Sequence, residues 1–379
     1  MAGANLQAIL GAPNLSGIIR QVEPGLASDV IPPEFMKVGR RVVGNVFEAT
    51  VVEGERRMAR ASAFGSPSQG FEAKGMGARA FSCVHTSHNI AFNANTLLAL
   101  FKPNTTEMQD AASDEVEREI IDFKQTFSNL RTASVTSVLT NQAIYFNTVG
   151  EVQASSTNAA LTVSYNIPAG NTGRLNPLGD GNIISAGWNT AGTDIIAQIK
   201  KIKIAARKLT NFPIAHAFYG VNVFGYLLQN TVLQAFLKHN PGWQQRFLEA
   251  ATQNEIPDGF MGLTWHSMEQ AFLVNAQTNP GGSMSAETVN GIFGDDQVVF
   301  TPEPNRGWYD LVEGSELVPQ TIDLVGETGV NLSDYKMEYG QWAYAKSLDD
   351  PLRLLVIMGD NFLPVIRSPK CIFNANVKI

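Results

Sequence analysis

The sequence predicts an α+β fold, and three observations support that prediction. Residues 104–149 contain no Gly or Pro, although the 379-residue chain has 33 Gly and 18 Pro. On both sides of this segment, runs of β-branched and aromatic residues have the pattern of strands. Only 17% of the residues are charged, where about 25% is usual, and the remaining charges are sorted by sign along the chain.

Residues 1–36 are expected to form an N-terminal arm. Gly and Pro interrupt this segment at close intervals. Its apolar residues follow no sustained period, so the segment has little on which to fold by itself. Two interpretations stay open: a disordered tail, and an extended arm that pairs with a neighbouring molecule.

Residues 37–92 are expected to form an extended β-hairpin loop. Strand-like runs cover 38–53 and 80–92, and repeated glycines break the segment between them. Long loops of this kind are usually functional. Because an isolated two-stranded hairpin is only marginally stable in water, we expect this hairpin to lie on another surface. Residues 37–79 hold eight basic and four acidic residues, a net charge of +4 in a chain whose net charge is -7.

The glycine-free segment predicts a long amphipathic helix over about 107–139. Thr106 and Gln109 have the spacing of a capping box. The apolar residues step by four, three, four and three positions and so share one face: Val116, Ile120, Phe123, Phe127 and Leu130. The helix is on the order of 50 Å long, and a single apolar stripe on so long a helix indicates that it lies across a sheet. Residues 107–124 carry seven acids and two bases, a net charge of -5.

The rest of the chain alternates shorter elements. Strands are expected at 144–146, 153–154, 161–167, 214–219, 259–274, 292–301, 308–325 and 352–358. A second amphipathic helix is expected from near Thr193, and further helices within 214–252. The sequence Gly359-Asp360-Asn361 predicts a turn before a last strand through Ile366. Buried strands so late in a chain usually close a sheet that began earlier.

The sequence contains no recognisable catalytic or cofactor motif. The glycines at 70 and 75 have P-loop spacing, but Met76 stands where the lysine is needed, and neither a nucleophile elbow nor a zinc-protease motif occurs. Cys83, His85 and His88 form the one metal-like cluster, but no second ligand pair follows, so we interpret them as ordinary strand residues. Catalytic, cofactor-binding and metal-binding residues are therefore predicted to be none, and no cofactor is expected, although an enzyme site built from distant residues stays open.

Charge and cysteine content limit the functional classes and cellular locations that remain. Five basic residues of the second helix form a patch that is suited to an acidic neighbour or nucleic acid, but a solvated helix face is the favoured interpretation: Lys200, Lys201, Lys203, Arg207 and Lys208. Residues 294–360 carry thirteen acids and four bases, interpreted as a solvated acidic face. Two cysteines give no disulfide framework and favour a reducing cytoplasm. Neither a secretory signal nor an apolar run of membrane-spanning length is visible.

The order of these parts resembles the tailed-bacteriophage major capsid proteins of the Hong Kong 97 fold, and most closely the lambda-type major head protein family. The likeness covers nearly the whole chain and depends on order and pattern. The segments that carry it are 42–92, 114–139, 141–146, 292–309 and 351–377.

The resemblance implies an architecture. It comprises an N-terminal arm (1–36), an extended loop (37–92), a peripheral domain with a long spine helix (93–189 and 334–379) and an axial α/β domain (190–333). Some members of the family cross-link covalently through a loop lysine. Lys74 is the one candidate in this loop, but its acceptor is not identifiable, so cross-linking is not predicted.

The resemblance also implies a function. The protein would self-assemble as hexamers and pentamers into a procapsid that matures into the icosahedral shell around the double-stranded DNA genome of a tailed phage. Its other partners would be a separate scaffold protein, a portal and, in some members, a cementing protein, with no membrane and no sequence-specific DNA contact. It would be assembled in the host cytoplasm and would reside in the virion.

The separation of basic and acidic segments along the chain is suited to contacts between copies of the protein. A basic loop on a neighbour's acidic helix would set the register between subunits. The candidate contact residues are Arg56, Arg57, Arg60, Lys74, Arg79, Asp114, Glu115, Glu119 and Asp122. Two alternatives stay open: a non-viral, encapsulin-like shell that holds a cargo enzyme, and a soluble oligomeric enzyme with a non-sequential site.

Overall fold

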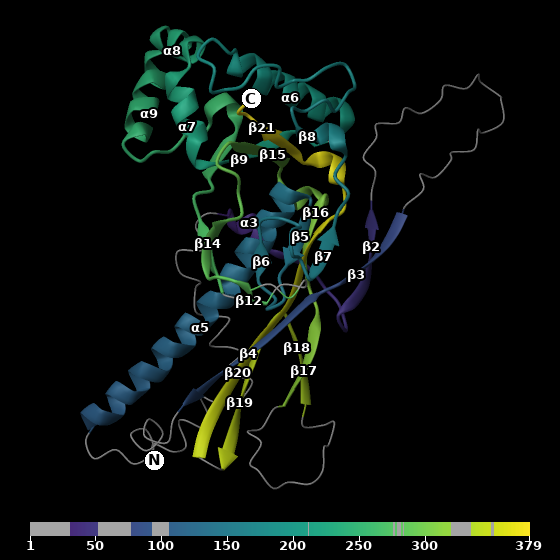
Figure 1. Ribbon diagram of the computed structural model, residues 1–379, viewed down its shortest axis with the longest axis vertical. Coiled ribbons are helices and arrows are strands. Elements are labelled where there is room, and N and C mark those ends of the chain that lie inside the picture. The colour runs from purple at the N-terminus through teal and green to yellow at the C-terminus, as the bar shows by residue number, and fades with distance from the viewer. Residues whose placement is uncertain are drawn as a thin grey trace, which may run out of the picture. The chain divides into compact units, whose positions relative to one another are not determined.

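The computed structural model describes residues 31–51, 77–92, 106–210, 212–275, 277–278, 282, 284–319, 335–349 and 352–379. The chain divides into two compact units. The first comprises 1–48, 80–132 and 311–364, and the second comprises 49–79, 133–310 and 365–379. Strands and helices both contribute to the structure (Figure 1), so the predicted α+β class is confirmed.

The first unit is built on a five-stranded sheet. Four of its strands follow one another in the order β1 (Val38–Arg41), β16 (Tyr309–Glu313), β20 (Leu352–Ile366) and β19 (Gln341–Asp349), and β4 (Val84–Phe92) also pairs with β20. β1 runs parallel to β16, whereas β19 and β4 run antiparallel to β20. The late strand β20 therefore closes a sheet that begins with β1 and β4, as the sequence predicts.

The predicted turn at 359–361 is wrong, because β20 runs through these positions. It is one continuous strand of 15 residues. Asp360 and Asn361 are fully buried in it, and Gly359 lies against the Trp342 ring, where any side chain would collide. Arg131 satisfies the Asp360 carboxylate. Tertiary contacts therefore override the local preference of Gly, Asp and Asn for turns.

The predicted long helix is confirmed as α5 (Thr106–Asn141), 36 residues long. In the first unit its apolar face packs on the sheet. Ile120 and Phe127 lie in one buried cluster with Phe92 of β4, Ala343 of β19 and Met358 of β20. This is the helix-on-sheet packing that the spacing of the apolar residues predicts.

The segment predicted as a loop is described at its two ends. β2 (Val46–Val51) pairs with β3 (Gly77–Ser82) in a two-stranded sheet, and Phe47 stacks on Phe81 with ring centroids 6.1 Å apart. Each predicted strand is thus divided in two, because β1 and β4 join the large sheet. At the end of the predicted arm, α3 (Pro33–Met36) is a short helix in which Phe35 is fully buried.

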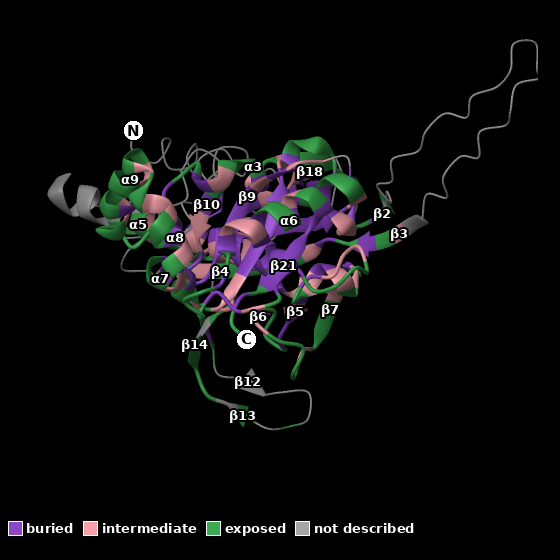
Figure 2. Cartoon of the chain, turned by 90° about the horizontal axis from the view of Figure 1, so that it is seen from above, coloured by how far each residue is buried: buried purple, intermediate pink, exposed green. Residues whose placement is uncertain are grey.

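The second unit has its own five-stranded sheet. The strand order is β10 (Thr264–Ser267), β9 (Ile214–Tyr219), β15 (Gln297–Pro302), β21 (Phe373–Asn376) and β8 (Thr172–Gly173). Helices α6 (Ile195–Leu209), α7 (Val221–Gln229), α8 (Thr231–Lys238) and α9 (Pro241–Ala251) pack on it around one apolar core. Figure 2 shows buried strands beneath α6, whose outward side is exposed.

α6 shows why these residues form a helix at this place. Asp194 caps its N-terminus by accepting a hydrogen bond of 2.9 Å from the backbone N–H of Ala197. Arg207 and Lys208 in its last turn complement the helix dipole. Ile199 and Ile202 of its inner face are fully buried, as the predicted apolar face requires.

The other elements of the described chain are short. β5 (Ala143–Phe146), β6 (Val152–Gln153) and β7 (Leu161–Ser164) form a three-stranded sheet, and three further sheets are two-stranded. Their pairs are β11 (Ala271–Val274) with β14 (Thr288–Gly291), β12 (Gln277–Thr278) with β13 (Met284–Ser285), and β17 (Ser315–Pro319) with β18 (Tyr335–Tyr339). The 3-10 helices are η2 (Ala169–Asn171), η3 (Phe260–Gly262), η4 (Pro304–Arg306) and η6 (Pro369–Cys371).

Candidate functional site

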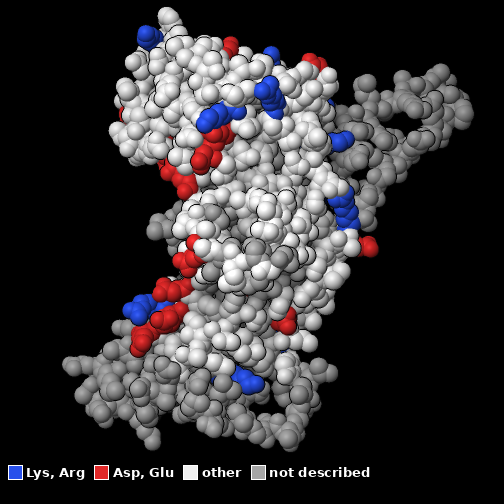
Figure 3. All heavy atoms as spheres, viewed as in Figure 1, with Lys and Arg blue, Asp and Glu red and all other residues white. Residues whose placement is uncertain are grey.

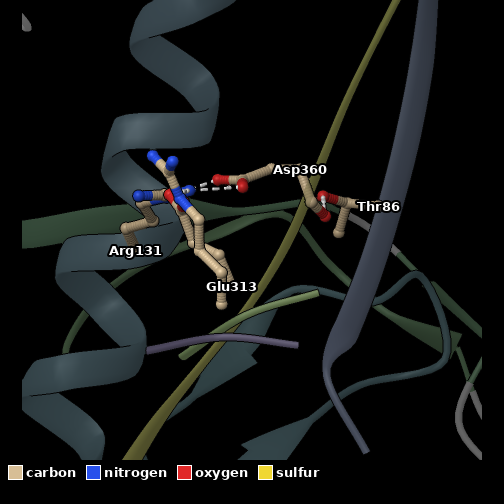
Figure 4. A network of polar contacts seen from close by, with 5 residues as sticks. Thr86, Arg131, Glu313 and Asp360 are labelled. Atoms are coloured by element: carbon tan, nitrogen blue, oxygen red, sulfur yellow. Dashed lines mark hydrogen bonds and ion pairs between the residues drawn. The ribbon is translucent and has the colours of Figure 1, made fainter. Parts of the chain in front are cut away.

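A buried ionic cluster lies in the first unit, where four elements meet (Figure 4). The guanidinium of Arg131, from α5, donates two hydrogen bonds to the carboxylate of Asp360 in β20: Nε to Oδ2 at 2.5 Å and Nη2 to Oδ1 at 2.6 Å. Nη2 also donates to Oε1 of Glu313, the last residue of β16, over 3.1 Å. The second oxygen, Oε2, accepts from Nε of Arg41 in β1 over 3.4 Å. Two cations and two anions therefore neutralise one another.

Register and helical spacing bring these residues together. The parallel pairing of β1 with β16 places Arg41 opposite Glu313. Arg131 follows Phe127 by four residues, so it lies on the face of α5 that packs on the sheet. Gly340 leaves room for the cluster: its φ is +68°, and a Cβ there would collide with the Glu313 carboxylate. Only glycine therefore fits this position without displacing the acid.

Burial makes the charges of the cluster interdependent. The side chains of Arg131 and Asp360 are 13% and 0% exposed. Burial alone would lower the pKa of Arg131, but Asp360 and Glu313 raise it above its ordinary value, so the guanidinium stays charged. The ring of Phe362 also lies 5.2 Å from this guanidinium. Bidentate, charge-assisted hydrogen bonds offset the cost of burying these ions, which is several kcal/mol for each ion.

Two neighbouring groups titrate away from their ordinary range. Burial raises the pKa of the Cys83 thiol to about 12 and outweighs the hydrogen bond from Gly314, while the carboxylates of Asp360 and Glu313 raise it further. Burial, followed by the charge of Arg131, lowers the pKa of Lys124. Burial is the larger cause of both shifts, and the charges of the cluster add to it.

A second polar group ties other strands to β20. Asn361 Oδ1 lies 2.6 Å from Nδ1 of His85 in β4, and its Nδ2 donates to Oε2 of Glu316 in β17 over 3.1 Å. Thr86 Oγ1 donates to the carbonyl oxygen of Asp360 over 3.1 Å. Together with the ionic cluster, these bonds fix the strands that lead into and out of the predicted loop against the sheet, and α5 with them.

Sequence reasoning missed this cluster. Its members are far apart in the chain, and no spacing rule connects them. One signal was present: Asp360 and Asn361 interrupt the apolar run of 352–366, and a charge inside such a run requires a buried partner.

The predicted loop residues are described in part. Arg56, Arg57, Arg60 and Lys74 lie outside the described residues. Arg79 lies in β3, where its side chain is partly exposed.

The predicted acids follow the first half of α5. Glu115 and Asp122 are exposed, and Glu119 is partly exposed and lies 3.8 Å from Arg118. Asp114 belongs to the helix, but its side chain lies outside the description. Figure 3 shows acidic atoms along the described part of this helix. Glu115, Glu119 and Asp122 therefore lie on one side of the helix, at least partly exposed.

The second unit contains a histidine pair. Nδ1 of His216 lies 3.1 Å from Nε2 of His266, and Nε2 of His216 lies 3.2 Å from Oε2 of Glu303. Burial, followed by the charge of His216, lowers the pKa of His266 to about 4 and outweighs Asp258, which acts in the opposite direction. His266 is therefore neutral at pH 7.

A cavity of about 370 Å³ opens in the second unit and is lined by Asn141, Ala154, residues 291–297 and Asn376. Its Asp296 carboxylate accepts hydrogen bonds from Tyr226 at 2.6 Å and Asn222 at 3.0 Å, and Lys378 Nζ lies 3.5 Å away. Burial alone would raise the pKa of Asp296, but these three groups lower it overall. Tyr226, Asn222 and Lys378 thus hold the acid as an anion.

The metal-like residues of the sequence are separate in the structure. Cys83 is buried, His85 bonds to Asn361, and His88 packs 5.9 Å from Phe127. Among the described residues, no three His, Cys, Asp or Glu side chains are grouped so as to hold a metal ion. None of the helices in the described chain combines the length and apolarity that crossing a membrane requires.

Comparison with known proteins gives one family match. The model of the family described as phage major capsid protein E matches residues 35–309. No curated protein matches the chain significantly.

Several solved structures are similar at low sequence identity. A capsid protein of a prophage from E. coli CFT073 is 12% identical, with a TM-score of 0.45, over 80% of this chain and 79% of that one. A phage-related protein from Bordetella bronchiseptica RB50 is 9% identical, with a TM-score of 0.45, over 97% of both chains. The capsid protein of cyanophage P-SCSP1u is 11% identical, with a TM-score of 0.43, over 95% and 94%.

The assignment follows from the family model alone, because its match covers well over half of the chain. It agrees with the order of hairpin ends, long spine helix and late sheet-closing strand in the described structure, and it confirms the resemblance that the sequence indicates. The chain belongs to the phage major capsid protein E family and is a phage major capsid protein.

Proposed function

We propose that this capsid protein assembles, as hexamers and pentamers of itself, into the icosahedral shell that encloses the double-stranded DNA of a tailed phage. The observation that carries the proposal is the separation of charge between two segments of one chain. Glu115 and Asp122 are exposed on α5 and form no ion pair with a described residue, while residues 37–79 have a net charge of +4. Such charges are neutralised when copies meet.

In this proposal, the loop of one copy lies on the acidic half of α5 of a neighbour. The loop contributes Arg56, Arg57, Arg60, Lys74 and Arg79, and the helix contributes Asp114, Glu115, Glu119 and Asp122. Exposed ion pairs contribute only about 0–1 kcal/mol each. The contact therefore sets register and partner choice more than affinity, and its effect is multiplied because every copy repeats it.

The proposal assigns a role to each part of the chain. Residues 1–36 form the arm that embraces a neighbour, 37–92 the extended loop, 93–189 with 334–379 the peripheral domain, and 190–333 the axial domain around the symmetry axes. The buried cluster at Arg131 supports this arrangement because it fixes β1, which leads into the loop, in the same packed group as α5. The protein thereby acts as a structural element and not as an enzyme.

The further partners in this proposal are a separate scaffold protein, a portal and, as in some members of the family, a cementing protein. DNA is enclosed without sequence-specific contacts, which suits a chain of net charge -7, because a strongly basic wall would bind the genome and slow its passage. Assembly takes place in the host cytoplasm, and the product is the capsid of the virion.

Sedimentation velocity and negative-stain electron microscopy of the purified protein test the proposal. We expect megadalton shells, or hexamers and pentamers when no scaffold is supplied. A small oligomer that never enters larger assemblies would support the soluble-enzyme alternative and contradict the proposal. The contents of shells isolated from the natural source distinguish a phage capsid from an encapsulin-like shell. Nuclease-protected DNA inside supports the phage capsid, and a cargo enzyme inside supports the encapsulin-like shell.

The loop contact has its own test. We expect Arg56→Glu, Arg57→Glu and Arg60→Glu together to block shell assembly and to leave circular dichroism and the melting temperature unchanged. Lys238→Glu with Arg246→Glu reverses two exposed cations of α8 and α9 and serves as the control for charge reversal outside the loop. Normal shells from the triple variant would overturn the loop contact but not shell formation.

A further inference from the structure

The outward face of α6 carries four exposed cations around one exposed apolar residue. Lys200, Lys201, Arg207 and Lys208 are all exposed. Ile204 is 51% exposed. At 3.6 residues per turn these five positions share one side of the helix, and Ile204 stands at their centre. The opposite side is packed into the core of the second unit.

None of these four cations forms an ion pair with a residue that the structure describes. Lys203, the fifth basic residue of the helix, differs because it is partly buried and its Nζ donates to the carbonyl oxygen of Met261 over 2.7 Å. Lys203 therefore serves the fold of its own unit. The other four have no such use within the described chain, so their charge is available to another molecule.

α5 presents a surface of opposite charge. Glu115 and Asp122 are exposed there and Glu119 is partly exposed, and at 3.6 residues per turn these three acids share one side of the helix. Along a helix axis, 115–122 spans about 10 Å and 200–208 about 12 Å. The two surfaces thus match in charge and in length, and the α6 face also has the apolar centre and charged rim of a protein–protein contact.

We propose that the basic face of α6 docks on the acidic stretch 115–122 of α5 in a second copy of the chain. The inference rests on the proposed function, since it supplies one of the contacts from which a shell is built. Two different surfaces meet in it, so the contact is head-to-tail and propagates from copy to copy into rings or a lattice. A self-paired contact, in contrast, would end at a dimer.

The surface favours a second copy over DNA. DNA presents phosphates, which offer no apolar partner to Ile204, whereas a protein surface carries apolar atoms beside its charges. The α6 contact and the loop contact would use the same acids of α5, namely Glu115, Glu119 and Asp122. Recovery of shells in the charge-exchange experiment below would therefore assign these acids to α6 and not to the loop.

Charge exchange between the two helices tests the proposal. The α6 variant carries Lys200→Glu and Lys208→Glu, the α5 variant carries Glu115→Lys and Asp122→Lys, and the third variant combines all four changes. We expect each double variant to reduce the yield of sedimenting shells at least tenfold, and the combined variant to recover it to within twofold of wild type. All four substituted residues are exposed, so circular dichroism should remain that of the wild type.

The matched control is Lys238→Glu with Arg246→Glu, which makes the same charge change elsewhere in the second unit. We expect it to assemble as wild type, and an equal loss in this control would overturn the proposal. Normal shells from the α6 variant that retain less DNA would assign the surface to DNA and overturn it too. If wild type forms shells but the combined variant does not recover them, the α6 contact fails alone; if wild type forms none, the proposed function fails with it.

Discussion

Arg131 and Asp360, 229 residues apart in the chain, form a bidentate ion pair through two hydrogen bonds of 2.5 and 2.6 Å. The Glu313 carboxylate accepts a further hydrogen bond from the same guanidinium and another from Arg41. The pair joins the spine helix to the central strand of the first unit. It therefore stabilises the packing of α5 on the sheet of the first unit.

We expect Arg131→Met to lower the free energy of unfolding by about 3–5 kcal/mol, because it leaves the Asp360 carboxylate buried without its cation. Urea unfolding followed by circular dichroism measures the loss. Arg41→Met is the matched control: the Arg41 side chain is 61% exposed, so its loss should cost only about 0–1 kcal/mol. Equal losses in the two variants would contradict the view that the buried pair dominates the cluster.

Gly340 is expected to tolerate no side chain. Gly340→Ala places a Cβ against the Glu313 carboxylate at a positive φ, and we expect it to destabilise the protein by about 1–3 kcal/mol. Gly225→Ala in α7 is the matched control, because open space surrounds that position and alanine in a helix is favoured by about 0.5–1 kcal/mol. The two variants should thus shift the urea midpoint in opposite directions; a stabilising Gly340→Ala would sink the argument.

The elements that the sequence predicted well are those with a long, uninterrupted period. α5 follows from its glycine-free apolar stripe, and the inner face of α6 follows from the spacing of Ile195, Ile199 and Ile202. β20 shows the opposite case. Its residues 359–361 have strong turn preferences, but Arg131 and Trp342 decide their conformation from distant parts of the chain. Local preference cannot reveal such partners.

The candidate site, like the fold, was predicted only in part. Exposed charges such as Glu115 and Asp122 were predicted because net charge along a helix can be counted in the sequence. The cluster of Arg131, Glu313 and Asp360 was not, because it exists only once a parallel strand pair and a helix–sheet contact have formed. Periodic patterns could therefore be interpreted from the sequence, whereas contacts between residues far apart in the chain could not.

His266 predicts a pH dependence of stability. Its pKa is about 4 in the folded protein against an ordinary value of 6.5, so between these two values the unfolded chain binds more protons. Its contribution is fully present above about pH 6.5 and is lost as the pH falls toward about 4, with a slope of at most about 1.4 kcal/mol per pH unit. We expect His266→Gln to flatten the curve in this window. Parallel curves for variant and wild type would contradict the assignment to His266.

The two cysteines are expected to be unreactive in the folded protein. Both are buried, and burial raises the pKa of Cys83 to about 12 and that of Cys371 to about 11. Because the thiolate is the reactive form, an aromatic disulfide reagent at pH 8 should label neither thiol in the native state and both after unfolding in urea. Ser82→Cys is the control, since residue 82 is exposed beside buried Cys83 and its thiol should react at once. If native wild type reacted as fast as this variant, Cys83 would have to become exposed readily, which would contradict its burial beside Asn45 and Gly314.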